Sequence, residues 1–257
     1  MYTLGIDIGS TTSKCAVIKD GKELVAHSLQ TGGLGTGGPE EAMAQLWQSC
    51  GLTRQDMACA FVTGYGRKNY EGADGEISEL TAHALGGRFV FPDLRTVIDI
   101  GGQDAKVIAL SPSGKMVNFV MNDKCAAGTG RFLDVMASIL RLDVDALDTE
   151  AAKATAPAAI SSTCTVFAES EVISQLANGV GRPDLVAGIC RSVASRVAAL
   201  ARRAGVTERV CLSGGVAQND AVRQALSDEL NVPVSVDPLA QYFGAIGAAL
   251  WAYKQQV

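Results

Sequence analysis

The chain has 257 residues, of which 47% are hydrophobic, 19% are charged and 28 are glycines. This length is enough for one large domain or two smaller ones, each with a hydrophobic core. Lysine and arginine total 22 against 27 for aspartate and glutamate, which gives a formal net charge of −5. Because proteins that bind nucleic acid need a basic surface, we do not expect a nucleic-acid partner.

The start of the chain predicts a cytoplasmic protein. Asp7 stands where a signal peptide requires cations followed by an unbroken apolar stretch. No run of apolar residues approaches the roughly 18 that a membrane-spanning helix needs. The seven cysteines include no C-x-x-C pair, and the only histidines are His27 and His83. A disulfide framework and a histidine-rich metal site are therefore not expected.

The strongest pattern is an internal repeat. Residues 6–18 (IDIGSTTSKCAVI) align without gaps on residues 98–110 (IDIGGQDAKVIAL). Each copy then runs into a polar turn and a further apolar segment. Both copies are typical of a strand, a tight glycine turn, a second strand, a turn and a third strand. The repeat therefore predicts two related halves.

Helical patterns follow each copy of the repeat. In the first half they predict a helix at 39–50, a strand at 58–64 and a helix at 77–87. In the second half they predict helices at 130–140, 166–177, 185–205, 221–230 and 244–253, with strands at 209–215 and 233–236. The expected fold is α/β with two similar lobes around a cleft. The lobes are expected at residues 1–94 and 95–257, with the C-terminal helix crossing back to the first lobe.

Three glycine-rich turns are candidates for a nucleotide site. The two repeated turns each deliver an aspartate from a buried strand into a loop whose backbone N–H groups can meet phosphate oxygens. Facing each other across a cleft, these turns would hold the phosphates of a nucleotide, with a hydrated Mg²⁺ near Asp7 or Asp99. A third turn, between a strand and a helix, would lie near the base or ribose. The alternative is that each is an ordinary turn with aspartate as turn former, which the duplication disfavours.

The candidate residues fall into four sets. The first turn contributes Asp7, Ser10, Thr11, Thr12, Ser13 and Lys14. The second contributes Asp99, Gly101, Gly102, Gln103 and Asp104. The third contributes Gly214, Gly215, Val216 and Gln218, and Gln241 is a further candidate near the nucleotide. Gln103 is expected to orient the attacking water, because an amide does so in other nucleotide hydrolases.

The cysteines separate into two groups. Cys125 and Cys164 each stand where a polar stretch enters a helix, a position that lowers a thiol pKa and favours metal binding. The other five are expected to be buried or unreactive: Cys15, Cys50, Cys59, Cys190 and Cys211. Two thiols cannot complete a four-cysteine iron–sulfur site, but a two-fold homodimer would supply the other two. A purely structural role for both remains the alternative from spacing alone.

The three glycine-rich turns resemble those of the actin, Hsp70 and sugar-kinase superfamily, whose members have two ribonuclease H-like lobes around a nucleotide. That resemblance implies two phosphate loops, beginning at Asp7 and Asp99, and an adenosine motif at Gly214 and Gly215.

Four further strings resemble a narrower family. NDKCAAGTGRF (122–132), SSTCTVFAESEV (161–172), IDIGGQD (98–104) and TGYGR (63–67) resemble the ATP-dependent activators of (R)-2-hydroxyacyl-CoA dehydratases, over essentially the whole chain. The resemblance implies an ATPase that donates one electron to a dehydratase, with 2-hydroxyglutaryl-CoA as the expected substrate of that partner. It also implies Mg²⁺ with ATP or ADP, and a homodimer that shares one [4Fe–4S] cluster held by Cys125 and Cys164. A ferredoxin or flavodoxin would supply the electron.

Three alternatives stay open from the sequence. The chain would otherwise be a small-molecule kinase of the same superfamily, the activating subunit of a related CoA-ester reductase, or a non-catalytic nucleotide switch or filament subunit.

Overall fold

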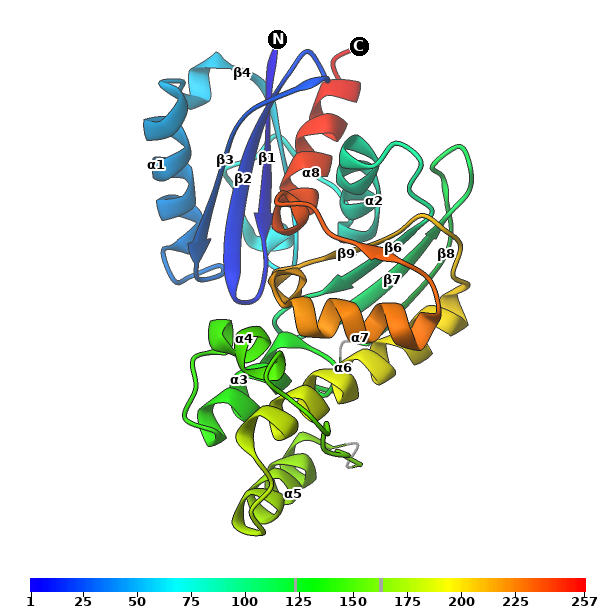
Figure 1. Cartoon of the computed structure of the whole chain (residues 1–257). Coiled ribbons are helices and arrows are strands. Elements are labelled where there is room, and N and C mark those ends of the chain that lie inside the picture. Colours follow the sequence, from blue (N-terminus) through cyan, green and yellow to red (C-terminus); the bar gives the residue numbers. More distant parts are fainter. Residues whose placement is uncertain (123, 162–163) are drawn as a thin grey trace. The chain divides into compact units, whose positions relative to one another are not determined.

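The computed structural model describes residues 1–122, 124–161 and 164–257, which are coloured along the chain in Figure 1. The chain forms two compact units. Unit 1 consists of Met1–Leu94, Leu110–Met116 and Asp237–Val257, and unit 2 consists of Arg95–Ala109 and Val117–Val236. In the described part of the chain, each unit carries helices and most or all of one five-stranded sheet. The predicted α/β fold is confirmed.

The sheet of unit 1 has the order β3-β2-β1-β4-β5. Strands β1, β2 and β3 are antiparallel to one another, whereas β4 is parallel to β1 and β5 to β4. The strands are β1 (Tyr2–Ile8), β2 (Thr12–Lys19), β3 (Glu23–Thr31), β4 (Met57–Thr63) and β5 (Gly75–Glu76). The helices are α1 (Gly38–Cys50), α2 (Glu79–Val90) and α8 (Phe243–Lys254).

Side-chain alternation along the strands gives unit 1 a hydrophobic core on each face of its sheet. Leu4, Ile6 and Ile8 pack with residues of α1 on one face, and Ala16 and Ile18 pack with residues of α8 on the other. Figure 1 shows α1 and α8 on opposite sides of the sheet. This two-residue period is the expected signature of a strand buried on both faces.

Glycines let α8 pack unusually close to its neighbours. A Cβ on Gly5 of β1 would lie 1.9 Å from the carbonyl oxygen of Ala245, and one on Gly247 would lie 1.8 Å from that of Ala82 in α2. Real Cβ atoms do not approach backbone this closely, so α8 can touch β1 and α2 only where a side chain is absent. The C-terminal helix is thereby fixed against β1, the strand that carries Asp7.

The sheet of unit 2 has the order β10-β9-β6-β7-β8. Strand β6 is antiparallel to β7 and parallel to β9, and β9 is parallel to β10. The strands are β6 (Thr96–Ile100), β7 (Ala105–Leu110), β8 (Met116–Asn122), β9 (Val210–Ser213) and β10 (Val234–Ser235). The helices are α3 (Gly130–Ile139), α4 (Leu147–Ala151), α5 (Thr165–Ala177), α6 (Arg182–Ala204) and α7 (Asp220–Leu230).

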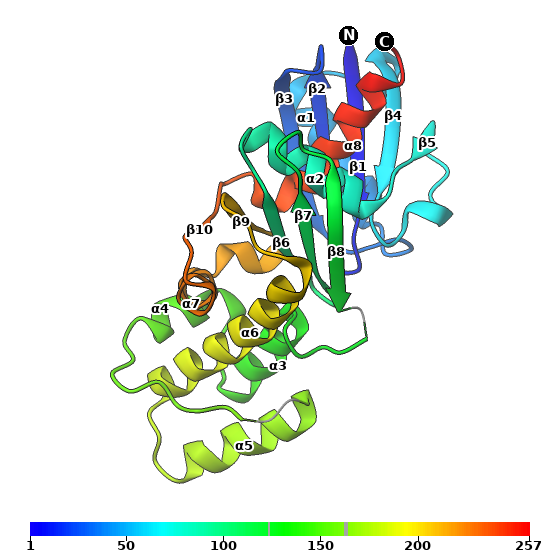
Figure 2. The same cartoon turned by 90° about the vertical axis from the view of Figure 1, so that its right-hand side faces the viewer.

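Helix α5 differs from the other helices of unit 2 in how little of it is buried. Ala168 and Val172 are its buried residues, whereas Val166 and Phe167 are 65% and 69% exposed. Figure 2 shows α5 at the far end of unit 2 from its sheet. Contiguous exposed apolar patches are common at surfaces that contact another molecule.

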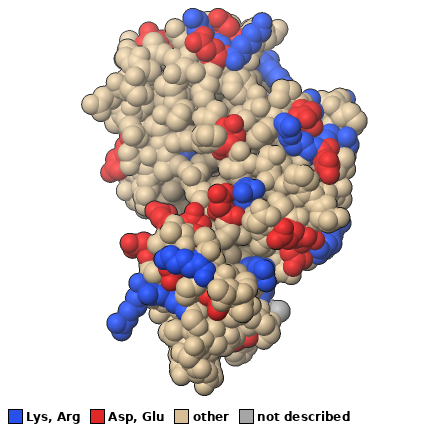
Figure 3. Space-filling view, viewed as in Figure 1, with Lys and Arg blue, Asp and Glu red and all other residues tan. Residues whose placement is uncertain are grey.

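The helices and strands predicted from sequence are present, with boundaries shifted by a few residues. The two-residue strand β5 and the short helix α4 were not predicted. Among the described residues, no helix is both long enough and apolar enough to cross a membrane. On the face seen in Figure 3, acidic and basic side chains are interspersed.

Candidate functional site

The first glycine turn lies between β1 and β2 in unit 1. Asp7 and Lys14 are direct partners across the two strands, and Lys14 Nζ lies 3.6 Å from Asp7 Oδ2. Both side chains are largely buried, with 7% of Asp7 and 13% of Lys14 exposed. Ser10 and Thr11 are exposed at the tip of the turn, where their hydroxyl groups and backbone are accessible. Hydrogen-bond donors of Ser10 and Thr11 are therefore exposed to solvent near the buried Asp7–Lys14 ion pair.

Thr12 and Ser13 occupy different environments from the turn's tip. Thr12 is half-buried, and its carbonyl accepts a hydrogen bond of 3.0 Å from the Gly9 N–H. Ser13 is buried, and its hydroxyl donates to the Gly32 carbonyl at 2.7 Å. The side chain of Ser13 thus joins the start of β2 to the end of β3.

Two glycines that are not among the candidate site residues enclose the Asp7 carboxylate. A Cβ on Gly64, after β4, would lie 2.5 Å from Asp7 Oδ1, and one on Gly244, in the first turn of α8, would lie 2.6 Å from Oδ2. Thr63 pairs with Asp7 in the sheet register, and its buried hydroxyl has no hydrogen-bond partner in the structure. Such a group is normally satisfied by water or a ligand. Gln241, half-buried, lies in the turn that leads into α8.

We expect Gly244→Ala to lower ATP hydrolysis while the chain stays folded. The added methyl group would force the Asp7 carboxylate from its place. Asp7 is expected to be a catalytic group, and small displacements of such a group cost at least about tenfold in rate. Gly181→Ala is the matched control, because its Cβ would lie 3.8 Å from the nearest atom, Pro183 Cδ, an ordinary van der Waals contact. Phosphate release and the thermal midpoint are measured for both variants. Unchanged turnover in Gly244→Ala would show that the position of Asp7 is not critical.

The second glycine turn lies between β6 and β7 in unit 2, and its aspartate is held more tightly. Asp99 Oδ2 lies 3.0 Å from Lys106 Nζ, its partner across the strands. Its Oδ1 accepts a hydrogen bond of 2.7 Å from Ser213 of β9. Lys106 also pairs with Asp104 at 2.8 Å. Asp99 and Lys106 are almost fully buried, so this network fixes the orientation of one carboxylate.

The rest of the second turn is partly open to solvent. Gln103 is exposed, whereas Gly101, Gly102 and Asp104 are half-buried. The Gly101 N–H donates to the Asp104 carbonyl at 2.9 Å, which closes the turn. An exposed amide at this point is free to meet a ligand or a water molecule.

The third turn joins the second within unit 2. Gly214 has φ +83°, and a Cβ there would lie 2.3 Å from the Ile100 carbonyl oxygen, so this position requires glycine. Gly215 and Gln218 are exposed and Val216 is buried, in the short turn between β9 and α7. Asn219 caps α7 by accepting a hydrogen bond from the Val222 N–H at 2.9 Å. The glycines that follow β6 and β9 therefore lie close together beside Asp99.

Helix α3 begins directly on the second turn. The backbone N–H groups of Gly130 and Arg131 donate to the carbonyls of Gly101 and Gly102, at 2.9 and 2.8 Å. The first N–H groups of a helix lack partners within the helix, and here the loop supplies them. This contact was not predicted from the sequence. It joins the candidate phosphate loop to the segment that contains Cys125.

Cys125 lies in the turn between β8 and α3 and is exposed. The Asn122 side chain holds this turn: its amide donates to the carbonyls of Cys125 and Ala127 at 2.8 and 3.2 Å, and its oxygen accepts from the Cys125 N–H at 3.3 Å. Asp123, part of the same motif, lies outside the described residues. The Cys125 thiol is thus exposed on a segment that Asn122 holds ahead of α3.

Cys164 is the N-cap residue of α5 and is also exposed. Glu171 of α5 accepts hydrogen bonds from the backbone and hydroxyl of Ser161 at 3.0 Å, which ties the preceding segment to the helix. Ser162 and Thr163 lie outside the described residues. Among those described, no group of three or more His, Cys, Asp or Glu side chains is placed to hold a metal ion. Two exposed thiols per chain fit a four-thiolate cluster only if a second chain supplies the other two.

The remaining cysteines have a different environment. Burial raises the pKa of the Cys15 and Cys190 thiols to about 12 and also raises that of Cys211. Cys59 is buried as well, with its pKa raised mainly by burial, and Cys50 is half-buried. Thiols of this kind are poor metal ligands, because the thiolate is the ligating form.

In the iron-free folded chain, we therefore expect iodoacetamide at pH 8 to alkylate Cys125 and Cys164 first. A group whose pKa is raised to about 12 stays protonated at that pH, so Cys15 and Cys190 should remain unmodified until the chain unfolds. Peptide mass spectrometry over time measures each site. Equal labelling of Cys190 and Cys164 in folded protein would contradict the assignment of two thiol classes.

The described residues thus form an α/β fold with three glycine-rich turns and two exposed thiols. A ROK-family glucokinase from Streptomyces griseus superposes with a TM-score of 0.59 at 16% identity, covering 99% of this chain and 100% of that one. At this identity the likeness shows the sugar-kinase type of fold alone. A profile of the BadF/BadG/BcrA/BcrD ATPase family matches residues 4–252, and the chain belongs to that family.

Two relatives are similar over their whole length. The (R)-2-hydroxyglutaryl-CoA dehydratase activating ATPase of Acidaminococcus fermentans is 57% identical over 256 residues, covering 99% of this chain and 98% of that protein; the crystal structure of this dehydratase's component A superposes with a TM-score of 0.96. The activator of 2-hydroxyisocaproyl-CoA dehydratase from Clostridium difficile, solved with bound ADPNP, is 50% identical with a TM-score of 0.96, covering 99% of this chain and 95% of that one. The resemblance stated from the four sequence motifs is confirmed.

Proposed function

We propose that this protein is the ATP-hydrolysing activator of a 2-hydroxyacyl-CoA dehydratase, with 2-hydroxyglutaryl-CoA as the expected substrate of the partner enzyme. Full-length identity to proteins named as such activators supports the proposal. The observation that carries it is the pair of hydrogen bonds that joins the second glycine turn to the start of α3, five residues after Cys125. A nucleotide loop and a candidate cluster ligand are thus parts of one hydrogen-bonded unit.

The glycine turns handle ATP and Mg²⁺ in this proposal. Ser10, Thr11 and Thr12 contact phosphate oxygens through hydroxyl and N–H groups, and Lys14 adds positive charge. Asp7 and Asp99 organise the hydrated Mg²⁺ and the water, because they are the buried carboxylates at the two strand ends. The exposed amide of Gln103 orients the attacking water. Gly214, Gly215, Val216 and Gln218 lie near the base or ribose in this proposal, and the remaining candidates for nucleotide binding are Ser13, Gly101, Gly102, Asp104 and Gln241.

The thiols of Cys125 and Cys164, with the same two thiols of a second chain, would hold one [4Fe–4S] cluster. Such a cluster can donate one electron. A ferredoxin or flavodoxin would reduce the cluster, and the cluster would pass the electron to the dehydratase. The exposure of both thiols supports this assignment, and so does the position of Cys164 at the N-terminus of α5, where N–H groups face sulfur charge. The exposed apolar residues Val166 and Phe167 of the same helix offer a contact surface for the second chain.

In this proposal, ATP turnover is coupled to the Cys125 segment through the start of α3. When the second turn changes its contacts between ATP and ADP, the carbonyls of Gly101 and Gly102 move with it, and the N–H groups of Gly130 and Arg131 follow. Asn122 holds the other end of the segment at Cys125. Hydrogen bonding and exposure around a cluster set its reduction potential, so this movement links hydrolysis to electron release.

Anaerobic purification tests the proposal against the kinase alternative. We expect a brown homodimer with four iron atoms for every two chains, a partner dehydratase that becomes active only with ATP, and release of inorganic phosphate. A colourless, iron-free protein that transfers phosphate to a sugar would overturn the proposal in favour of a kinase.

A further inference from the structure

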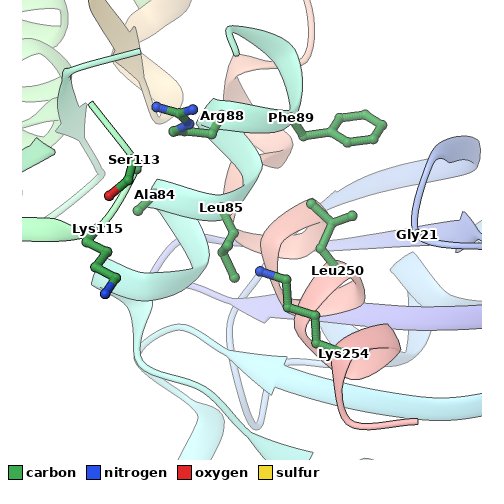
Figure 4. A pocket seen from close by; sticks show the side chains of 10 residues that line it. Gly21, Ala84, Leu85, Arg88, Phe89, Ser113, Lys115, Leu250 and Lys254 are labelled. Atoms are coloured by element: carbon green, nitrogen blue, oxygen red, sulfur yellow. The ribbon is translucent and has the colours of Figure 1, made fainter. Parts of the chain in front are cut away.

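A surface pocket lies wholly within unit 1, and none of its residues belongs to the glycine turns or the cysteine segments. It encloses about 500 Å³ between the end of α2, the end of α8, the β2–β3 turn and the tip of the β7–β8 hairpin. Figure 4 shows its lining side chains. The proposed ATPase mechanism makes no use of this pocket.

Three cationic side chains from three different segments line the pocket. They are Arg88 of α2, Lys115 of the hairpin and Lys254 of α8. None of them forms an ion pair with any residue that the structure describes. The nearby acidic residues of the β2–β3 turn are already paired, Asp20 with the N-terminal amine at 2.6 Å and Glu23 with Lys19 at 4.0 Å. The pocket therefore has an unbalanced positive charge.

The guanidinium of Arg88 is held in place without losing its charge. Its Nη1 donates to the carbonyl of Pro112 at 3.2 Å and to that of Leu94 at 3.5 Å. The hairpin tip packs on the same side chain, since a Cβ on Gly114 would lie 2.9 Å from Arg88 Cδ. Carbonyl partners orient a cation but do not neutralise it, so Arg88 remains available to an anion.

The pocket has a partly apolar lining. Leu85, Phe89 and Leu250 line it, and each is half-buried and packs against a buried cluster of unit 1. In Figure 4, Leu85 lies between Arg88 and Lys254, and the Lys254 ammonium is directed toward it. An apolar surface bordered by a few placed polar groups is the usual composition of a small-molecule site.

We propose that this pocket binds a small organic anion, with a phosphate or carboxylate attracted by the positive charge of Arg88, Lys115 and Lys254 and an apolar chain or ring on Leu85, Phe89 and Leu250. The size of the pocket favours a small molecule over a protein segment. None of the pocket residues belongs to the nucleotide loops, so anion binding at the pocket can be measured separately from ATP binding. A bound anion would also tie the hairpin tip to α2 and α8.

Calorimetric titration of the full-length protein with hexyl phosphate tests the proposal, with ADP and Mg²⁺ at saturation to block the nucleotide site. We expect saturable binding at one site. The affinity for hexyl phosphate should be about tenfold or more higher than that for inorganic phosphate, because the hexyl chain is transferred from water to the apolar lining. No saturable binding, or equal affinity for the two probes, would overturn the proposal.

Charge reversal locates the site. Lys115 and Lys254 are exposed, so their replacement leaves the core intact. Lys115→Glu and Lys254→Glu are each expected to weaken hexyl phosphate binding about fivefold or more. Lys68→Glu, an exposed lysine of unit 1 outside the pocket, is the matched control and should leave the affinity unchanged. An equal effect in all three variants, or no effect in either pocket variant, would place the anion elsewhere and contradict the proposal.

Discussion

Asp99→Asn is expected to lower ATP hydrolysis by about 10²–10³-fold while the protein stays folded and keeps its iron. In the proposed mechanism the charge of Asp99 organises the hydrated Mg²⁺, and the asparagine amide lacks that charge. The fold should survive, because asparagine can still accept from Ser213, and Lys106 keeps its ion pair with Asp104. Phosphate release, the thermal midpoint and iron content are the measurements.

The matched control is Asp145→Asn, which removes an exposed carboxylate of unit 2 away from both glycine turns. It should hydrolyse ATP at the normal rate. If Asp99→Asn turns over ATP like this control, Asp99 has no part in the mechanism, and the second glycine turn loses its assigned role.

Cys125→Ala is expected to abolish iron binding, since in a symmetric dimer one substitution removes two of the four ligands. Cys164→Ala should have the same effect. Neither cysteine belongs to a glycine turn, so both variants should still bind ATP with unchanged affinity, but neither should activate a dehydratase. Both are also expected to shift toward monomer, because a shared cluster contributes to dimer stability.

Cys50→Ala is the control for these variants, because Cys50 is half-buried on α1 of unit 1 and should retain full iron. Iron per chain and nucleotide affinity are measured without oxygen. Full iron content in Cys125→Ala would contradict a cluster shared between two chains.

The sequence predicted the parts of the fold that depend on local pattern. The repeated string IDIG with a lysine seven residues after the aspartate predicts a hairpin, and both copies place that pair opposite each other, Asp7 with Lys14 and Asp99 with Lys106. The separation of the cysteines also followed from local pattern, because apolar strands and helices bury their thiols and polar helix entries expose them.

Contacts between distant segments were not predictable in this way. Gly64 and Gly244 enclose Asp7 from segments that lie 57 and 237 residues later in the chain. The bonds from Gly130 and Arg131 to the second turn depend on how α3 packs, which no local pattern encodes. The short elements α4 and β5 gave too few residues for a period to be visible.

Within the first glycine turn, the sequence motif did not predict the direction of the Ser13 side chain. In the sequence it belongs to a run of hydroxyl residues with Ser10, Thr11 and Thr12. In the structure the strand alternation turns its side chain to the Gly32 carbonyl. A sequence motif therefore predicts which segment of backbone lies at a binding site more reliably than it predicts which side chains point into that site.

The proposed coupling of ATP hydrolysis to electron donation is tested most directly by measuring dehydratase activation by the reduced protein under strict exclusion of oxygen. Prereduced wild-type protein is mixed with the dehydratase and Mg²⁺, with ATP, with a non-hydrolysable analogue or without nucleotide. We expect dehydration of the 2-hydroxyacyl-CoA to begin only with ATP, and to fail with Asp99→Asn and with Cys125→Ala. Equal activation without nucleotide, or activation by Cys125→Ala, would contradict an electron donor driven by ATP hydrolysis.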